Sequence, residues 1–420
     1  MSELFTVVTP GEAFSILAER CTPPVRTEIV PLAQALGRVL SSPLAAGESL
    51  PSFARSTMDG YAVRAADTHG ASEQSPVYLR LAGDVPTGVV PDSVLAAGDA
   101  IRIHTGSMLP PGADAVVMVE ETNLHPGAAG RGDEIEVLAA AAPGENVVDV
   151  GEDVRAGQRA VEAGHRLRAA DLGGLAALGV TELSVTARPR VAILSTGDEV
   201  VPAAQTPRAA QVRDVNAETI AAVVEQAGGI PVRLGIVHDD QPQLEAALRA
   251  AISGVDALVL SAGSSVSVRD LTARAVERLG APGVLVHGIA IRPGKPTVLA
   301  LCNGVPVVGL PGNPASALVV AWRIVRPLVR LLHGERVEPD GLGDERERSA
   351  VLELAVPSRP GREDFVPATL ARGEEGSLRA RPVFGASNLI FTLVRADALI
   401  AVPLDRSGLA AGETVRVILL

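Results

Sequence analysis

The sequence predicts an α/β multidomain chain whose central unit is a doubly wound, mostly parallel sheet. Three observations predict this architecture. Between about residues 188 and 335, short apolar runs alternate with segments of helical period. Strand-like runs without intervening helices occupy residues 75–140, and similar runs return over 350–420. The chain has 420 residues, of which 47 % are apolar, so it can bury several hydrophobic cores.

The N-terminal half begins with two expected helices and continues into a β-rich domain. Thr9 and Glu12 have the spacing of a capping box, with Pro10 at the first helical position, which predicts a helix over 9–21. A second short helix is expected over 31–41. Four strand-like runs separated by Pro and Gly turns then predict the β-rich domain: VYLRLAG, AIRIHTG, AVVMVEE and DEIEVLA.

The central unit is predicted from strands that alternate with helices of about 10–15 residues, a pattern typical of parallel crossover units. After the charged linker GLGDERERS, the runs VLELAV, LIFTLV, ALIAVP and TVRVILL predict a small C-terminal barrel or sandwich. The expected strands of the central unit are 190–195, 231–237, 256–260, 284–289, 297–302 and 305–309, and its expected helices are 216–228, 242–253, 270–279 and about 314–332.

Charge and composition exclude several classes of protein. The chain carries 37 Lys and Arg against 49 Asp and Glu, so no broad positive field favours a nucleic acid or an anionic membrane. Its two cysteines form neither a disulfide framework nor a zinc motif. No apolar run approaches the length of a membrane span, and residues 1–8 lack the features of a signal peptide. These observations predict a cytoplasmic protein.

Chemistry is expected at the loops that follow the strands of the central unit, because ligands of open α/β sheets bind beyond the carboxyl ends of the strands. Gly- and Ser-rich turns offer backbone N–H groups to phosphate oxygens. Carboxylates suit Mg²⁺, which commonly binds one or two of them together with substrate phosphate. The loops therefore predict an anion site that works with a metal at one edge of the sheet. Five loops hold such small, hydroxylic, charged or Gly/Pro residues: 195–199, 238–240, 261–270, 292–296 and 311–314.

The charged residues of these loops each have a plainer structural interpretation. Asp270, and one of Asp239 and Asp240, precede helical segments and can be N-caps. Arg292 can pair with a surface carboxylate. What favours a site is the joint occurrence of such residues at successive strand ends. Lys295 supports it further, because a lone lysine in a chain with 37 Lys and Arg suggests a position that needs a compact ammonium group.

A separate stretch, residues 56–62, contains Asp59 and Gly60, which by themselves predict a tight turn. Other kinds of site are disfavoured by spacing. The seven histidines lack the spacing of a zinc site, and the chain has no nucleophile elbow. No Walker loop and no dinucleotide fingerprint is present either.

Eight stretches, taken in order, resemble the molybdopterin molybdenumtransferase family, which includes bacterial MoeA and the E domain of gephyrin. The C-terminal stretch RPVFGASNLIFTLVRADALIAVP is similar to the last domain of that family. The resemblance extends over nearly the whole chain. The eight stretches are STMDGYAV (56–63), RIHTGSMLPPGADAVVMVEET (102–122), GEDVRAGQ (151–158), STGDEV (195–200), VRDVNAETI (212–220), GIVHDD (235–240), IAIRPGKPT (289–297) and GLPGNPASA (309–317).

The resemblance implies a reaction, an assembly and a domain division. The reaction is the last step of molybdenum cofactor synthesis, in which molybdate is inserted into adenylylated molybdopterin with Mg²⁺-dependent release of AMP. The assembly is a homodimer whose site takes residues from both subunits, which would bring Asp59 to the loops of the other chain. The implied domains are an extended N-terminal subdomain (1–54 and 141–187), a β-rich domain (55–140), a doubly wound, molybdopterin-binding-like domain (188–335) and a C-terminal β-barrel-like domain (345–420).

The matching motifs also imply roles for individual residues. The chain departs from the family's usual glycine-rich loop at 261–267, which reads SAGSSVS, and from its basic residues at 148–150, which read VDV. The implied catalytic residues are Asp59, Glu199, Asp239, Asp270 and Lys295, of which Glu199, Asp239 and Asp270 are implied metal ligands. The implied substrate-binding residues are Thr105, Gly197, Asp198, Ser261, Gly263, Ser264, Ser265, Arg292, Pro311, Asn313 and Pro314.

Two alternative functions stay open. A molybdopterin adenylyltransferase has a single domain similar to residues 188–330, and the additional N- and C-terminal domains favour the molybdenumtransferase. A non-catalytic pterin-binding or scaffold protein on the same fold is the second alternative, because a fold does not fix a function. The acidic and basic residues of the loops speak against it.

Overall fold

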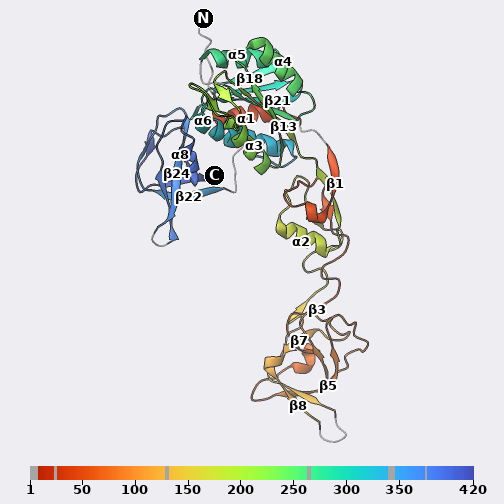
Figure 1. The fold of residues 1–420 in the computed structure, drawn as a ribbon. Coiled ribbons are helices and arrows are strands. Elements are labelled where there is room, and N and C mark those ends of the chain that lie inside the picture. Colours follow the sequence, from red (N-terminus) through yellow and green to blue (C-terminus); the bar gives the residue numbers. More distant parts are fainter. Residues whose placement is uncertain (1–7, 23–25, 128–131, 263–265, 339–345, 374–375) are drawn as a thin grey trace.

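The computed structural model describes residues 8–22, 26–127, 132–262, 266–338, 346–373 and 376–420, and it describes residues 266–270 by their backbone alone. Figure 1 shows an α/β unit with a C-terminal barrel beside it. An arm leads away from the α/β unit to a small subdomain around α2 and then to a β-rich domain at its far end (Figure 1). Within the described part of the chain, we find no helix with the length and apolar character of a membrane span.

The α/β unit is built on a six-stranded sheet in the order β16-β13-β17-β21-β20-β18. The first four strands are parallel, and β20 runs antiparallel to both of its neighbours. The mostly parallel sheet predicted from the sequence is therefore confirmed. Its strands are β13 (Arg190–Thr196), β16 (Ile230–Val237), β17 (Ala257–Ala262), β18 (Pro282–His287), β20 (Val298–Cys302) and β21 (Val305–Pro311).

Helices cover both faces of this sheet. Alternate residues of β17 explain why: Val259 enters the core on one face, and Leu258 and Leu260 enter the core on the other. A strand covered on both faces is a continuous apolar run, as the sequence shows here. The helices are α3 (Asn216–Gln226), α4 (Gln241–Ala251), α5 (Val266–Glu277), and α6 (Pro314–Val320), which continues through the π-helical segment η4 (Ala321–Val325) into α7 (Arg326–Leu332).

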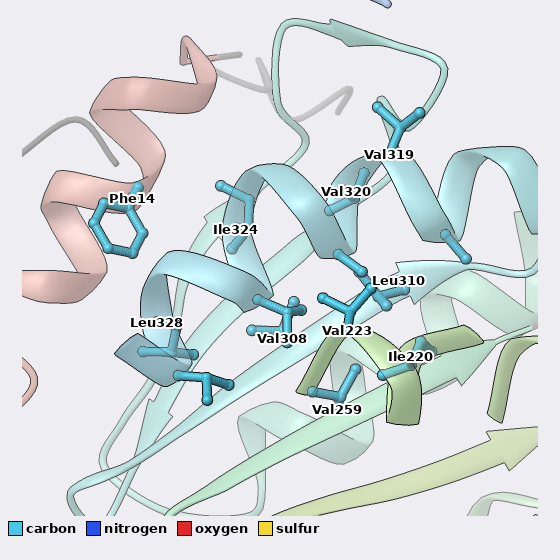
Figure 2. Close-up of a cluster of buried hydrophobic side chains, with 14 of the residues drawn as sticks. Phe14, Ile220, Val223, Val259, Val308, Leu310, Val319, Val320, Ile324 and Leu328 are labelled. Atoms are coloured by element: carbon cyan, nitrogen blue, oxygen red, sulfur yellow. The ribbon is translucent and has the colours of Figure 1, made fainter. Parts of the chain in front are cut away.

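Helix α1 (Pro10–Ala18) packs into the larger of these two cores. The predicted capping box is confirmed: Glu12 N donates to Thr9 Oγ1, and Thr9 N donates to the Glu12 carboxylate. Phe14 is 1 % exposed and lies with Ile324 and Leu328 in the same cluster (Figure 2). The first helix thus shares a core with the α/β unit, although the range 1–54 is expected to form the N-terminal subdomain.

The expected helix over 31–41 is wrong, because only the 3₁₀ turn η1 (Leu32–Gln34) forms there. Gly37 has a φ of 73°, a left-handed conformation that ends the turn. Val39 and Leu40 then pair as isolated bridges with Arg166 and Val185, so the segment is held in extended form. In the same subdomain α2 spans Ala169–Ala177, and the strands pair as β1 (Thr27–Pro31) with β12 (Glu182–Thr186), and β2 (Leu44–Ala45) with β11 (Arg159–Val161).

The arm ends in a curled six-stranded sheet in the order β7-β4-β6-β5-β9-β8, which confirms the β-rich domain. The two-stranded ladder of β3 (Arg55–Ser56) and β10 (Val147–Val148) stands where the chain enters and leaves this domain. The domain also contains the 3₁₀ turns η2 (Ala65–Thr68) and η3 (Val119–Glu121). The six strands are β4 (Gly60–Val63), β5 (Val77–Val85), β6 (Asp99–Ile103), β7 (Ala115–Met118), β8 (Thr122–His125) and β9 (Glu134–Val137).

The C-terminal domain is a closed five-stranded barrel, because β24 pairs with both β25 and β26. One short strand of the α/β unit, β19 (Ile291–Arg292), adds to the barrel by parallel pairing with β24. The barrel strands are β22 (Glu347–Leu352), β24 (Glu363–Arg372), β25 (Leu378–Pro382), β26 (Ala398–Val402) and β28 (Thr414–Leu419), with the small pair β23 (Val356–Pro357) and β27 (Gly408–Leu409).

The predicted strand over 389–394 is wrong, because this segment contains the short helix α8 (Phe391–Val394). Its backbone bonds are local: the N–H groups of Thr392 and Leu393 donate to the carbonyls of Leu389 and Ile390. Leu393 alone among the helix residues is buried, whereas Phe391 is 63 % exposed. The apolar run therefore resembles a strand in sequence without being part of the barrel wall.

Candidate active site

Four of the five predicted loops lie at one edge of the α/β sheet as far as the structure describes them. The strands β13, β16, β17 and β21 are parallel, so their carboxyl ends share that edge. Strand β18 reaches the same edge, because β20 runs antiparallel to both β18 and β21. The edge therefore collects the segments 197–199, 238–240, 288–297 and 311–313. Gly263, Ser264 and Ser265 lie outside the described residues, as does the side chain of Asp270.

The loops after β13 and β16 form an acidic end of this edge. The ring Nδ1 of His238 lies 3.0 Å from Asp198 Oδ1, and the backbone N–H of Asp239 donates to the same oxygen at 3.3 Å. The contact with His238 lowers the pKa of the Asp198 carboxyl. Burial, followed by the charges of Asp198 and Glu199, raises the pKa of Asp239. Two neighbouring carboxyls are thus held in opposite electrostatic conditions.

Gly197 fixes the backbone that carries this acidic end. Its φ of 144° lies in the region that favours glycine. A Cβ at this position would lie 2.7 Å from Val200 Cγ2 and 2.9 Å from Glu199 Oε2. The plainer interpretation holds for Asp240, whose Oδ1 caps α4 by accepting from the backbone N–H of Gln243. Because Asp240 is the N-cap of α4, the carboxylate of Asp239, one residue earlier, is not needed to cap this helix.

The acidic end fits a hard cation. Asp239 Oδ1 is buried and accepts no hydrogen bond within the described residues. The described side chains contain no cluster of three or more metal-ligating groups. Mg²⁺ does not require one, because it usually binds one or two carboxylates and completes its shell with phosphate and water. Asp239 with Glu199 can supply such a partial ligand set.

The middle of the edge is held together by Asn216, a residue that the sequence analysis did not single out. Its Nδ2 donates to Ser261 Oγ at 2.7 Å and to the Gly312 carbonyl at 2.8 Å. Asn216 therefore joins the end of β17 to the loop after β21. Ser195 pairs in register with Ser261, and both are buried. The one available signal was the position of Asn216 inside the stretch VRDVNAETI.

The basic end of the edge opens into a cavity of about 840 Å³ between the α/β unit and the barrel. Arg292 and Lys295 line it from the loop after β18, and Arg362 lines it from the barrel. Arg362 Nε donates to Asp364 Oδ1 at 2.8 Å, and Arg292 Nη1 lies 3.5 Å from Asp364 Oδ2. Arg292 does pair with a carboxylate, then, but with one that is 2 % exposed and belongs to the barrel.

The loop after β21 borders the same cavity with Pro311 and Asn313. Asn313 Nδ2 donates to Ser387 Oγ at 3.1 Å, and the backbone N–H of Ala315 donates to the Ser387 carbonyl at 3.0 Å. Pro314 occupies the first turn of α6, where a proline needs no donor. The barrel segment around Ser387 thus closes one side of the cavity. No spacing in the sequence predicted this contact between the two domains.

Asp59 and Thr105 form a separate polar cluster on the β-rich domain. Asp59 Oδ1 accepts from the Thr105 backbone N–H at 2.7 Å and from Thr105 Oγ1 at 2.9 Å. These hydrogen bonds lower the pKa of Asp59. The β-rich domain stands at the far end of the arm from the α/β unit (Figure 1). A single chain therefore does not bring Asp59 and Thr105 to the strand-end loops.

Three family models match this chain: the MoeA N-terminal region (domain I and II) over residues 8–179, a probable molybdopterin binding domain over 192–331, and the MoeA C-terminal region (domain IV) over 349–420. A protein of Haemophilus influenzae named molybdopterin molybdenumtransferase is 32 % identical over 98 % of both chains. The chain belongs to the MoeA family.

Further MoeA relatives agree with the fold. A Mycobacterium tuberculosis protein named molybdopterin molybdenumtransferase 2 is 37 % identical over 92 % of this chain and 94 % of its own length. The crystal structure of a molybdopterin biosynthesis MoeA protein from Pyrococcus horikoshii OT3 matches with a TM-score of 0.82 at 29 % identity, over 99 % of this chain and all of that one. These matches confirm the family resemblance and the multidomain fold that the sequence predicts.

Proposed function

We propose that this chain is a molybdopterin molybdenumtransferase that inserts molybdate into adenylylated molybdopterin and releases AMP. Its membership of the MoeA family makes it an enzyme of molybdenum cofactor biosynthesis. The observation that carries the finer proposal is the division of one sheet edge into an acidic end, with Asp198, Glu199 and Asp239, and a cation-lined cavity at Lys295. The two ends suit a phosphate-bound cation and a free oxyanion.

Molybdate is assigned to the cavity. Arg292, Lys295 and Arg362 supply positive charge there, and guanidinium groups match the oxygen spacing of tetrahedral anions. The backbone carbonyl of Lys295 accepts from Ile289 N and Thr297 N, but its ammonium group makes no hydrogen bond or ion pair with the residues that the structure describes, so it is available to an anion. Pro311 and Asn313 place the loop after β21 between this cavity and Ser261, where the dithiolene of the pterin would receive the metal.

Mg²⁺ is assigned to the acidic end. Asp239, Glu199 and Asp270 would hold it, with the buried Asp239 Oδ1 as the clearest candidate ligand. Bound there, Mg²⁺ would neutralise negative charge on the phosphates of the adenylylated substrate. The chain's own residues position that substrate: Gly197 allows close approach of the backbone, and Asn216 keeps the loops at Ser261 and Gly312 together.

Asp59 and Thr105 are assigned to the site of a second copy. The arm separates them from the strand-end loops of their own chain, so a homodimer with crossed arms would complete each site. Two inactive variants, Asp59→Asn and Lys295→Ala, test this assignment when they are mixed and allowed to exchange subunits. One site of each mixed dimer would be intact, and we expect activity to return to about a quarter of the wild-type value. Mixtures that stay inactive, while each variant still dimerises, would place both residues in one chain's site.

The reaction itself is tested with purified protein, adenylylated molybdopterin, molybdate and Mg²⁺, following cofactor and AMP together. Equal amounts of the two products are expected. Formation of adenylylated molybdopterin from ATP and molybdopterin would instead support the adenylyltransferase alternative. We place the reaction in the cytoplasm, since Cys21 and Cys302 are both free thiols buried in the fold.

A further inference from the structure

The subdomain around α2 meets the α/β unit at a closely packed joint. Gly164 has a φ of 77°, and a Cβ there would lie 3.0 Å from the Gly334 carbonyl oxygen. Gly334 in turn packs against the subdomain, since its own Cβ would lie 3.0 Å from Thr186 Oγ1. The two backbones are therefore in direct contact. We define the joint as Gly164 and Arg166 on the side of the subdomain, and residues 226–229 and 334–335 on the side of the α/β unit.

Arg166 joins the two sides of this joint. Its backbone belongs to the subdomain, where it bridges to Val39. Its guanidinium reaches the α/β unit: Nη1 donates to Glu335 Oε1 at 3.0 Å and to the Ala227 carbonyl at 3.3 Å, and Nη2 donates to the Gln226 carbonyl at 3.4 Å. These carbonyls stand at the C-terminal end of α3, where a helix leaves its last carbonyls without intrahelical partners. One side chain thus bonds to three groups of the other unit.

Glu335 makes this contact firmer than an ordinary surface ion pair. Its side chain is 4 % exposed, and an ion pair with a buried partner is less screened by solvent than an exposed one. The second oxygen of Glu335 accepts from Arg330 Nε at 2.7 Å. Arg330 lies in α7 of the α/β unit itself, so Glu335 keeps a partner when Arg166 is removed. Arg166 can therefore be substituted without leaving this buried carboxylate unpaired.

Two further contacts lie on the segments that connect the units. Arg26 precedes β1 and pairs with Asp256, and Arg188 follows β12 and donates from Nε to the Gly228 carbonyl at 3.0 Å. These two arginines hold the ends of the β1–β12 ribbon. A two-stranded ribbon by itself is a weak support. Arg166 belongs to neither strand, so it braces the ribbon from a third segment of the subdomain.

We propose that Arg166 is a positioning residue that holds the arm in one direction, so that Asp59 of one chain reaches the strand-end loops of the other. The inference rests on the proposed function, because it assumes that the arms cross in a homodimer. Rotation at the joint moves the far end of the arm, which carries the β-rich domain, more than the near end (Figure 1). A misplacement of about 1 Å at a reacting group can lower a rate by about a hundredfold.

Spin labels on the full-length protein measure the joint directly. Cysteines introduced at Ala177 on α2 and Gln243 on α4 are both exposed, whereas the two native thiols are buried. Dilution with unlabelled chain restricts the signal to distances within one chain. We expect Arg166→Ala to broaden the distance distribution at least about twofold. Arg159→Ala is the matched control, because Arg159 is an exposed arginine of the same subdomain that pairs with Glu162 inside it. An equal width in the two variants would overturn the inference.

The consequence for the reaction is tested in the mixed dimers of Asp59→Asn and Lys295→Ala. The active site of such a dimer takes Lys295 from the first variant and its arm from the second. Arg166→Ala added to the Lys295→Ala chain should lower kcat at least about fivefold and leave KM for molybdate unchanged, because that chain supplies the arm. The same substitution added to the Asp59→Asn chain should leave kcat within about twofold, because the arm of that chain serves no active site.

The two placements separate the arm from the fold of the site. Asn216 begins the helix whose last carbonyls Arg166 binds, so support of the site in its own chain is the competing explanation. An equal loss in both placements, or a loss confined to the Asp59→Asn chain, would establish that explanation and overturn the inference, as would no loss in either placement. If the mixture without Arg166→Ala stays inactive although both variants dimerise, the crossed-arm assignment of the proposed function fails and the inference fails with it.

Discussion

Asn216 gives the sharpest test of how the strand-end loops are held together. Its side chain is 6 % exposed and donates two hydrogen bonds, at 2.7 Å to Ser261 Oγ and at 2.8 Å to the Gly312 carbonyl. Asn216→Ala removes both bonds and leaves the Gly312 carbonyl without this donor. Each lost bond costs about 0.5–1.5 kcal/mol, and a buried group left unpaired costs about 1–3 kcal/mol. Together they predict a destabilisation of roughly 2–6 kcal/mol.

The assay follows the α/β unit directly. The chain has one tryptophan, Trp322, which lies in η4 of this unit, and the guanidinium groups of Arg326 and Arg346 lie over its ring. Urea unfolding followed by its fluorescence therefore reports on the unit that contains Asn216. Because Asn216 positions loops at the middle of the edge, we also expect its loss to raise KM for adenylylated molybdopterin more than KM for molybdate.

The matched control for this prediction is Gln226→Ala, on the exposed side of the same helix α3. That variant should change the free energy of unfolding by less than about 0.5 kcal/mol. An Asn216→Ala variant that unfolds like the control, or that raises both KM values equally, would refute the role given to Asn216. The second result would mean that Asn216 supports the fold without positioning the two loops.

Three further predictions concern stability. Gly60→Ala would place a Cβ 2.0 Å from the Val117 carbonyl oxygen, so we expect calorimetry to show the β-rich domain destabilised by about 3 kcal/mol or more, with the Trp322 transition unchanged. Burial raises the pKa of Asp239, so its ionised form destabilises the fold. Asp239→Asn should raise the thermal midpoint at neutral pH and abolish cofactor formation. The gain in thermal midpoint should disappear below the ordinary pKa of Asp, because Asp239 is then protonated in both the folded and the unfolded chain. Burial lowers the pKa of His333 from 6.5 to about 4, so the unfolded chain binds the proton first. Stability should fall as the pH drops from about 6.5 through 4, and urea unfolding of His333→Gln should show a shallower dependence.

The α/β unit could be predicted from the sequence because each of its elements carries its own signal. Strand β17 is a continuous apolar run, since both of its faces are covered, and α1 begins at a complete capping box. The segments 31–41 and 389–394 were predicted wrongly, because their local pattern was ambiguous. In 31–41 only a short turn forms, and Gly37 after it is left-handed. The segment 389–394 has no partner strand and forms the helix α8.

The candidate site was predictable where it follows from topology. Parallel strands bring their carboxyl ends to one edge, so Gly197, Lys295 and Pro311 could be grouped before any coordinates were known. Arg362 and Asp364 could not be added, because their place in the cavity depends on how β19 pairs with the barrel strand β24. No pattern within one segment encodes the docking of two domains.

The strand order itself explains why the charged ends of the edge do not neutralise one another. In the order β16-β13-β17-β21-β20-β18, the acidic loops follow the first two strands and the loop of Lys295 joins the last two. At about 4.8 Å for each strand, the strands from β13 to β20 span roughly 14 Å, which exceeds the screening length of about 8 Å at physiological ionic strength. Asp239 and Lys295 therefore do not form the ion pair that would fill both sites. Each end keeps its charge for a ligand, and a substrate must extend across β17 and β21 to use both. An elongated, phosphate-containing pterin meets that requirement, whereas a small anion alone does not.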